Sequence, residues 1–165
     1  MKLVEGRTNI EDIDEFLARL GAIGDEFDCA IQAFDARYVA GCDHLESAVE
    51  HANRAFERGD SIARDPAVEI LLYAAGRRQI NQALEMGVSE GEQRLVVAID
   101  GKQNGNETAA ASALSEILVP AETLGNPDRE TMFDFFDLSE RELEATSATL
   151  SDLVCERVAL LEVEK

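Results

Sequence analysis

The chain has 165 residues, 45% of them hydrophobic and 30% charged, and its 34 Asp and Glu outnumber its 15 Lys and Arg. This length is enough for a single domain with its own core, and the formal net charge of −19 excludes wholesale electrostatic binding of nucleic acid or of an anionic membrane. No apolar run is long enough to span a bilayer, and the first residues become polar too soon for a signal peptide, so we expect a cytoplasmic protein with no membrane partner.

The spacing of apolar residues predicts short strands that alternate with helices. In chain order we expect a strand at 1–5, a helix at 10–20, a strand at 29–34, a helix at 43–58, a helix at 66–75 with a second helical segment as far as Gly87, a strand at 94–100, a helix at about 107–118, two short helices after Asn126 and after Ser139, and a strand at 158–163. We therefore predict an α/β fold: a single domain over residues 1–165, with a small mixed sheet of about four strands that is interleaved and covered with helices.

Residues that favour helix ends support these boundaries. The expected starts are marked by Asn9, by the capping-box pattern Asp43-x-x-Glu46, by Asp65-Pro66 and by Ser139-x-x-Glu142, and the expected ends by Gly21, Gly59 and Gly76. The clearest strand is 94–100, because its continuous apolar run suits a strand covered on both faces.

Two composition details indicate the cellular setting. Only three of the basic residues are lysine, and an acid-rich, lysine-poor surface is what we expect in a cytoplasm with molar salt; the alternative is an acidic protein from an ordinary cytoplasm. An odd number of cysteines without a C-x-x-C motif indicates reduced, intracellular thiols at Cys29, Cys42 and Cys155.

The sequence contains no motif that predicts covalent chemistry. Dinucleotide-binding, serine-hydrolase and HExxH zinc patterns are missing. Gly101-Lys102 resembles the end of a phosphate-binding loop, but Gln103 replaces the Ser or Thr that would hold magnesium. The metal candidates form an incomplete set of soft ligands, namely Cys42, His44 and His51. We predict no catalytic residue, no metal and no cofactor.

The local charge is anomalous between Arg54 and Arg78. Five arginines and four acidic residues give this segment a net charge of +1 in a chain of −19. The simplest interpretation is that these arginines pair with acidic neighbours such as Glu57, Glu69 and Glu85. The alternative is a binding site for an anionic partner.

At this segment the sequence resembles a known family. The stretch from Glu69 to Leu84, which contains Ala-Gly-Arg-Arg-Gln-Ile, resembles the signature of the small KEOPS subunit that binds the kinase of that complex. The helix start His44-Leu45-x-x-Ala48 and the closing passage 156–163 match the same family, so the resemblance covers most of the chain, whereas 101–140 match poorly.

This resemblance implies a non-enzymatic role. KEOPS adds a threonylcarbamoyl group to the adenosine beside the anticodon of certain tRNAs. The family implies that this chain docks on the small atypical kinase-ATPase of the complex and holds the single-stranded CCA 3′ end of the tRNA. The RNA-binding residues carried over by the motif, together with one nearby arginine, are Gly76, Arg77, Arg78, Gln79, Ile80 and Arg64.

The chemistry of these residues suits such a ligand. Guanidinium planes stack on unpaired bases and contact phosphate, and a glutamine side chain can read a base edge. We expect Arg77 and Arg78 to lie near a helix start, where backbone N–H groups favour phosphate. Ile80 is the ambiguous member, because the helical phase would also suit a core position.

The partner surface is predicted from an apolar stripe near the C-terminus. Leu150, Leu153 and Val154 share one side of a helix, and we expect part of that stripe to remain uncovered for the kinase. The alternative patch is the cluster from Phe133 to Phe136. Two other functions stay open from the residues alone: an acidic protein–protein adaptor without RNA contact, and a small enzyme that works through carboxylates.

Overall fold

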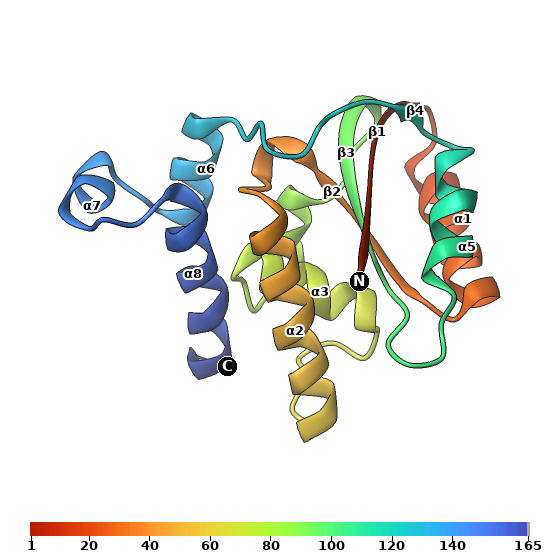
Figure 1. The fold of residues 1–165 in the computed structure, drawn as a ribbon, viewed down its shortest axis with the longest axis horizontal. Coiled ribbons are helices and arrows are strands. Elements are labelled where there is room, and N and C mark those ends of the chain that lie inside the picture. The colour runs from red at the N-terminus through yellow and green to blue at the C-terminus, as the bar shows by residue number, and fades with distance from the viewer. Residues whose placement is uncertain (165) are drawn as a thin grey trace. The chain divides into compact units, whose positions relative to one another are not determined.

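The computed structural model describes residues 1–164, and the chain divides into two compact units (Figure 1). The first unit comprises Met1–Ala36 and Gly87–Thr123, and the second comprises Arg37–Met86 and the chain from Leu124 onward. Among these residues, no helix is both long and apolar enough to cross a membrane.

The first unit contains the sheet. Its elements are β1 (Lys2–Ile10), α1 (Ile13–Phe27), β2 (Ala30–Asp35), β3 (Gly91–Asp100), α5 (Glu107–Ser115) and β4 (Val119–Pro120). The four strands lie in the order β2-β3-β1-β4, and all three pairings are antiparallel, so the predicted α/β class is confirmed but the sheet is not mixed. The long β1–β3 ladder runs from Lys2 opposite Ile99 to Ile10 opposite Gly91.

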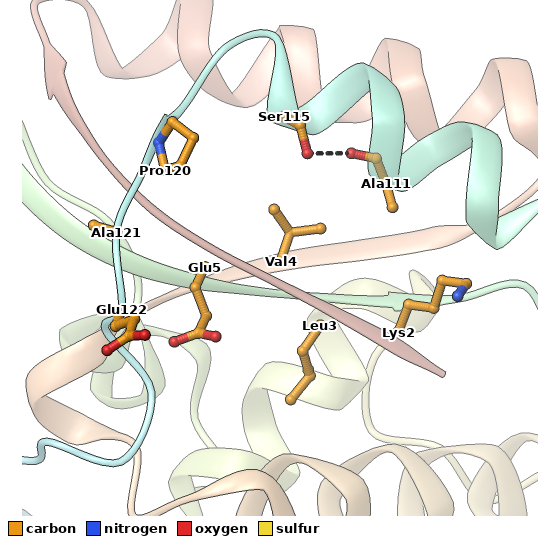
Figure 2. Close-up of a pocket in the computed structure, with 9 residues that line it drawn as sticks. All are labelled: Lys2, Leu3, Val4, Glu5, Ala111, Ser115, Pro120, Ala121 and Glu122. Carbon is orange, nitrogen blue, oxygen red and sulfur yellow. Dashed lines mark hydrogen bonds between the residues drawn. The ribbon is translucent and has the colours of Figure 1, made fainter.

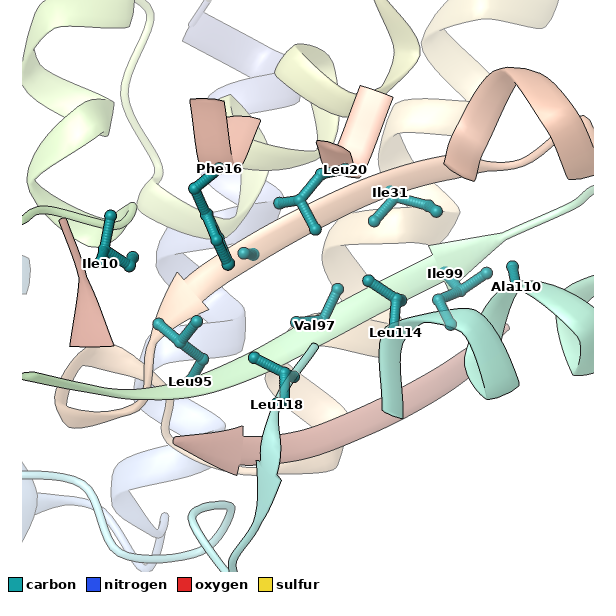
Figure 3. Packing of buried hydrophobic residues seen from close by; sticks show 11 residues of the cluster. Ile10, Phe16, Leu20, Ile31, Leu95, Val97, Ile99, Ala110, Leu114 and Leu118 are labelled. Carbon is teal, nitrogen blue, oxygen red and sulfur yellow. The ribbon is translucent and has the colours of Figure 1, made fainter. Parts of the chain in front are cut away.

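The core of this unit lies between the sheet and two helices. Side chains from α1 and α5 pack onto alternate residues of β3, namely Leu95, Val97 and Ile99 (Figure 3). The residues from Leu95 to Asp100 are all buried, as the continuous apolar run of this strand predicts.

The start and end of α1 differ from the prediction. β1 continues to Ile10 because that side chain is buried in the core, so Asn9 belongs to the strand and Asp12 is the N-cap instead, accepting a bond from the Glu15 N–H at 3.2 Å. The helix passes through Gly21 and ends before Asp28, whose φ of 54° is left-handed.

The second unit is helical. After the 3₁₀ turn η1 (Ala36–Tyr38) that spans its start, its elements are α2 (Cys42–Arg58), α3 (Pro66–Ala75), α4 (Ile80–Ala83), the 3₁₀ turn η2 (Leu84–Met86), α6 (Arg129–Phe136), α7 (Glu140–Ala145) and α8 (Leu150–Glu164). The predicted caps at Asp65 and Ser139 are confirmed, since each side chain accepts a backbone N–H of its own helix. The Asp43 capping box does not form, because the N-cap of α2 is Gly41 and no side chain bonds to that end of the helix.

The predicted C-terminal strand is wrong. Residues 158–163 belong to α8, and the fourth strand is β4. Leu153, Val154, Val158 and Leu161 are buried at helical spacing, and α8 packs against α2 and α3. A helix buries that stripe, whereas an isolated strand would expose every second residue of it.

Candidate functional site

The motif predicted to bind RNA begins at the turn that ends α3. Gly76 adopts a φ of +62°, and the N–H groups of Gly76 and Arg77 bond back to Tyr73 and Leu72, each at 3.0 Å. A side chain at Gly76 would place its Cβ 3.3 Å from the Arg157 carbonyl oxygen of α8. Both the left-handed backbone and this close approach to α8 favour glycine at this position.

The Arg77 side chain makes its contacts within the protein. Its half-buried guanidinium donates to the Phe135 carbonyl oxygen and lies 4.7 Å from the centroid of the Phe135 ring. Arg157 likewise donates to the carbonyls of Phe136 and Asp137, both at 3.2 Å. The two arginines satisfy carbonyls at the C-terminal end of α6, where the helix has no donors of its own. Arg77 therefore links the turn to the end of α6, and its guanidinium already has a partner within the protein.

The next three side chains face solvent. Arg78, Gln79 and Ile80 are all exposed, and Ile80 retains 47% of its accessible surface, so it is not a core residue. Within residues 1–164 the Arg78 side chain makes no hydrogen bond and no ion pair. Gln79 precedes α4, and its backbone carbonyl accepts the N–H groups of Gln82 and Ala83.

The expectation of a helix start beside the two arginines is incorrect. Arg77 and Arg78 are not helical, and α4 begins only at Ile80 and has four residues. Such a short helix has too few aligned peptides to attract a phosphate to its N-terminus. What the turn provides is a row of exposed side chains.

The structure does not place Arg64 beside Arg78. Arg64 is exposed on the loop before α3, and the ten residues of that helix separate the two arginines by about 15 Å along its axis. The Glu69 carboxylate, expected to pair with an arginine, is buried and accepts the N–H groups of Ile62 and Ala63 at 3.0 and 2.8 Å. Glu69 thus holds the loop that carries Arg64.

Two other arginines do form intramolecular pairs. Arg58 lies 2.9 Å from Glu162 of α8, and Arg54 lies 3.9 Å from the same carboxylate. Their partner is distant in sequence, so local charge counting missed it. These two arginines are therefore paired within the protein, but with Glu162 and not with the predicted neighbours Glu57, Glu69 and Glu85. Arg78, by contrast, is exposed and makes no such pair among the residues that the structure describes.

The predicted partner stripe is mostly buried. Leu153 is 2% exposed, Val154 is fully buried and Leu150 is half-buried, so this side of α8 packs inside the protein. The exposed large apolar residues of α8 are Leu160, at 40%, and Val163, at 81%. Leu160 also lines a hollow of about 160 Å³ beside the turn, together with Ala75, Gly76, Arg77, Phe135, Phe136, Asp137, Arg157 and Glu164.

The two histidines have structural roles. His44 is fully buried; its Nδ1 accepts the Ala40 N–H at 3.1 Å and its Nε2 lies 2.7 Å from the Ala74 carbonyl oxygen. Burial lowers the pKa of His44 to about 4, so the ring stays neutral and ties α2 to the end of α3. His51 stacks on Tyr73 at 5.5 Å between ring centroids. Among residues 1–164 no three potential ligands are grouped to hold a metal ion.

Comparison with known proteins identifies the family of the chain. None of the curated proteins compared with the chain matches it. The family model described as kinase binding protein CGI-121 matches residues 7–162, which include the glycine turn, the exposed row after it and most of α8. The chain therefore belongs to the CGI-121 family, the non-catalytic kinase-binding subunits of KEOPS.

Proposed function

We propose that this subunit binds the KEOPS kinase-ATPase and also recruits tRNA through its single-stranded CCA 3′ end, in support of threonylcarbamoyl-adenosine modification. The observation that supports the proposed RNA binding is the exposed row of Arg78, Gln79 and Ile80, which directly follows the glycine turn at the end of α3. Arg78 is a cation without a partner among residues 1–164, in a chain whose net charge is −19.

Each residue of the row contributes a different contact. The Arg78 guanidinium can stack on an unpaired base or bond a phosphate, the Gln79 amide can read a base edge, and Ile80 offers apolar surface to a base. Arg77 anchors the turn to the Phe135 carbonyl, so the backbone that carries these groups is held in place, which lowers the entropic cost of binding.

The acidic composition favours such a local mode of binding. The lysine-poor, acid-rich sequence supports a halophilic, archaeal origin and a cytoplasm with high salt. At molar salt the Debye length is only about 3 Å, so long-range attraction to phosphates is lost. Stacking and direct hydrogen bonds remain, and they suit a flexible single strand better than a duplex.

For the kinase we propose the exposed face of α8. Leu160 and Val163 are three residues apart on this helix and therefore neighbours on its surface. Burying them against a partner gains about 25 cal/mol per Å² of apolar area before association costs, and this gain survives high salt. The alternative aromatic cluster is less available, because Phe135 and Phe136 are 6% and 4% exposed.

The RNA proposal is tested by tRNA binding at high salt. Arg78→Glu should weaken binding by about tenfold, since one stacked base contributes about 1–3 kcal/mol. Arg19→Glu, at an exposed arginine of α1, makes the same charge change and should leave affinity unaltered. Removal of the terminal CCA should weaken wild-type binding as Arg78→Glu does. Equal affinity for trimmed and intact tRNA would contradict the single-strand proposal, and no binding of either tRNA would favour an adaptor without RNA contact.

The kinase surface is tested by co-purification. Val163→Glu should greatly reduce recovery of the kinase while the fold is retained, because this side chain is 81% exposed. Leu17→Glu, at an exposed leucine of α1, is the matched control and should bind normally. Normal kinase recovery with folded Val163→Glu would remove this face from consideration.

A further inference from the structure

The sheet has an incomplete edge in the first unit. β4 follows β1 at this edge but pairs with it only at Gly6 and Arg7, so among residues 1–164 no strand pairs with the outer edge of Lys2 to Glu5. Every second residue of an edge strand presents an N–H and a C=O outward, in position to bond another strand.

The chain after β4 is held away from that edge. The Thr123 N–H bonds the Glu5 carboxylate at 2.9 Å and the Thr123 hydroxyl donates to the Leu95 carbonyl at 2.7 Å. Arg94 bonds the Glu122 carbonyl at 3.0 Å. Pro120 has no N–H to extend the ladder. β4 therefore ends after two residues and does not fill the edge.

An open hollow of about 690 Å³ occupies this position (Figure 2). One side is the β1 edge from Lys2 to Glu5, and α5 contributes only the small residues Ala111 and Ser115. A strand would lie about 4.8 Å from β1, and short side chains on α5 leave room for it. Glu5 and Glu122 lie at one end of the hollow and Lys2 at the other (Figure 2).

We propose that this slot binds a short extended segment of a partner protein, which adds to the sheet as a strand beside Lys2–Glu5. Running antiparallel to β1, in the direction of β4, such a segment meets Glu5 first and Lys2 last. The charges of the slot then favour a basic residue opposite Glu5 and, three positions later, an acidic residue opposite Lys2. Backbone hydrogen bonds to β1 provide the affinity, and the charges at the two ends of the slot determine the orientation of the bound segment.

The test is a selection from a displayed library of random peptides, followed by affinity measurement with the enriched peptides. Ser115→Trp places a large ring in the slot and should reduce their affinity at least tenfold. Ser112→Trp, the same substitution at an exposed serine of the same helix but outside the slot, is the matched control and should bind the peptides normally. N-methylation of the peptide backbone should abolish binding, and Glu122→Lys should weaken peptides with the basic residue by about two- to fivefold.

Three results would overturn the proposal. The first is that no peptide is enriched, and the second is that enriched peptides bind Ser115→Trp as well as wild type. The third is that the protein alone is a dimer that Ser115→Trp separates, which would assign the edge to a second copy. Binding of tRNA should be the same for Ser115→Trp and wild type, so failure here is distinguishable from failure of the RNA proposal.

Discussion

Leu153 and Val163 belong to the same helix but lie in different environments, and this difference gives a quantitative prediction. Leu153 is 2% exposed and Val163 is 81% exposed. Truncation of a buried leucine to alanine removes apolar contacts and leaves a cavity, at a cost of about 2–5 kcal/mol. Truncation of an exposed valine removes few contacts and changes stability by less than about 0.5 kcal/mol.

We therefore expect Leu153→Ala to lower the free energy of unfolding by about 3 kcal/mol and Val163→Ala to leave it nearly unchanged. For a chain of 165 residues, 3 kcal/mol corresponds to a fall in Tm of about 6–12 °C. Denaturant unfolding at constant high salt measures both variants, and an unchanged m-value would confirm that the native state alone is affected.

Kinase recovery should show the opposite order. Val163→Ala should weaken co-purification, whereas the folded fraction of Leu153→Ala should still bind, because its side chain does not reach the surface. A loss below about 0.5 kcal/mol for Leu153→Ala would refute the assignment of this side chain to the core. It would also restore the stripe of Leu150, Leu153 and Val154 as the docking surface.

Two further predictions concern the elements that support the turn. Gly76→Ala should lower the free energy of unfolding by about 1–2 kcal/mol through backbone strain. The loss should exceed that of Gly59→Ala, because both glycines have a left-handed φ but only Gly76 faces the Arg157 carbonyl. Equal losses in denaturant unfolding would show that this contact is unimportant. His44 has a folded pKa of about 4, below the ordinary value of 6.5, so the unfolded chain takes up this proton first and stability should fall with pH below about 6.5. Between pH 7 and pH 5 wild type should lose about 2 kcal/mol more than His44→Gln, and parallel pH profiles would contradict a buried neutral ring.

Local sequence signals were sufficient where one segment decides its own structure. Asp65-Pro66 starts α3 and Gly76 ends it, because a side-chain cap, a fixed proline φ and a left-handed glycine act within a single turn. The continuous apolar run of β3 likewise predicted a buried strand.

Other features depend on segments that meet only in the folded chain. Residues 158–163 are apolar enough for a strand, but in the folded chain they form part of a helix that packs against α2 and α3. Arg77 is engaged within the protein because it contacts the ring of Phe135, and Arg58 is paired because it contacts Glu162. Neither of these partners is close in sequence. The sequence by itself determined the motif and the family it resembles. The tertiary structure decided which of the motif's side chains remain free, because side-chain contacts and burial depend on packing between distant segments.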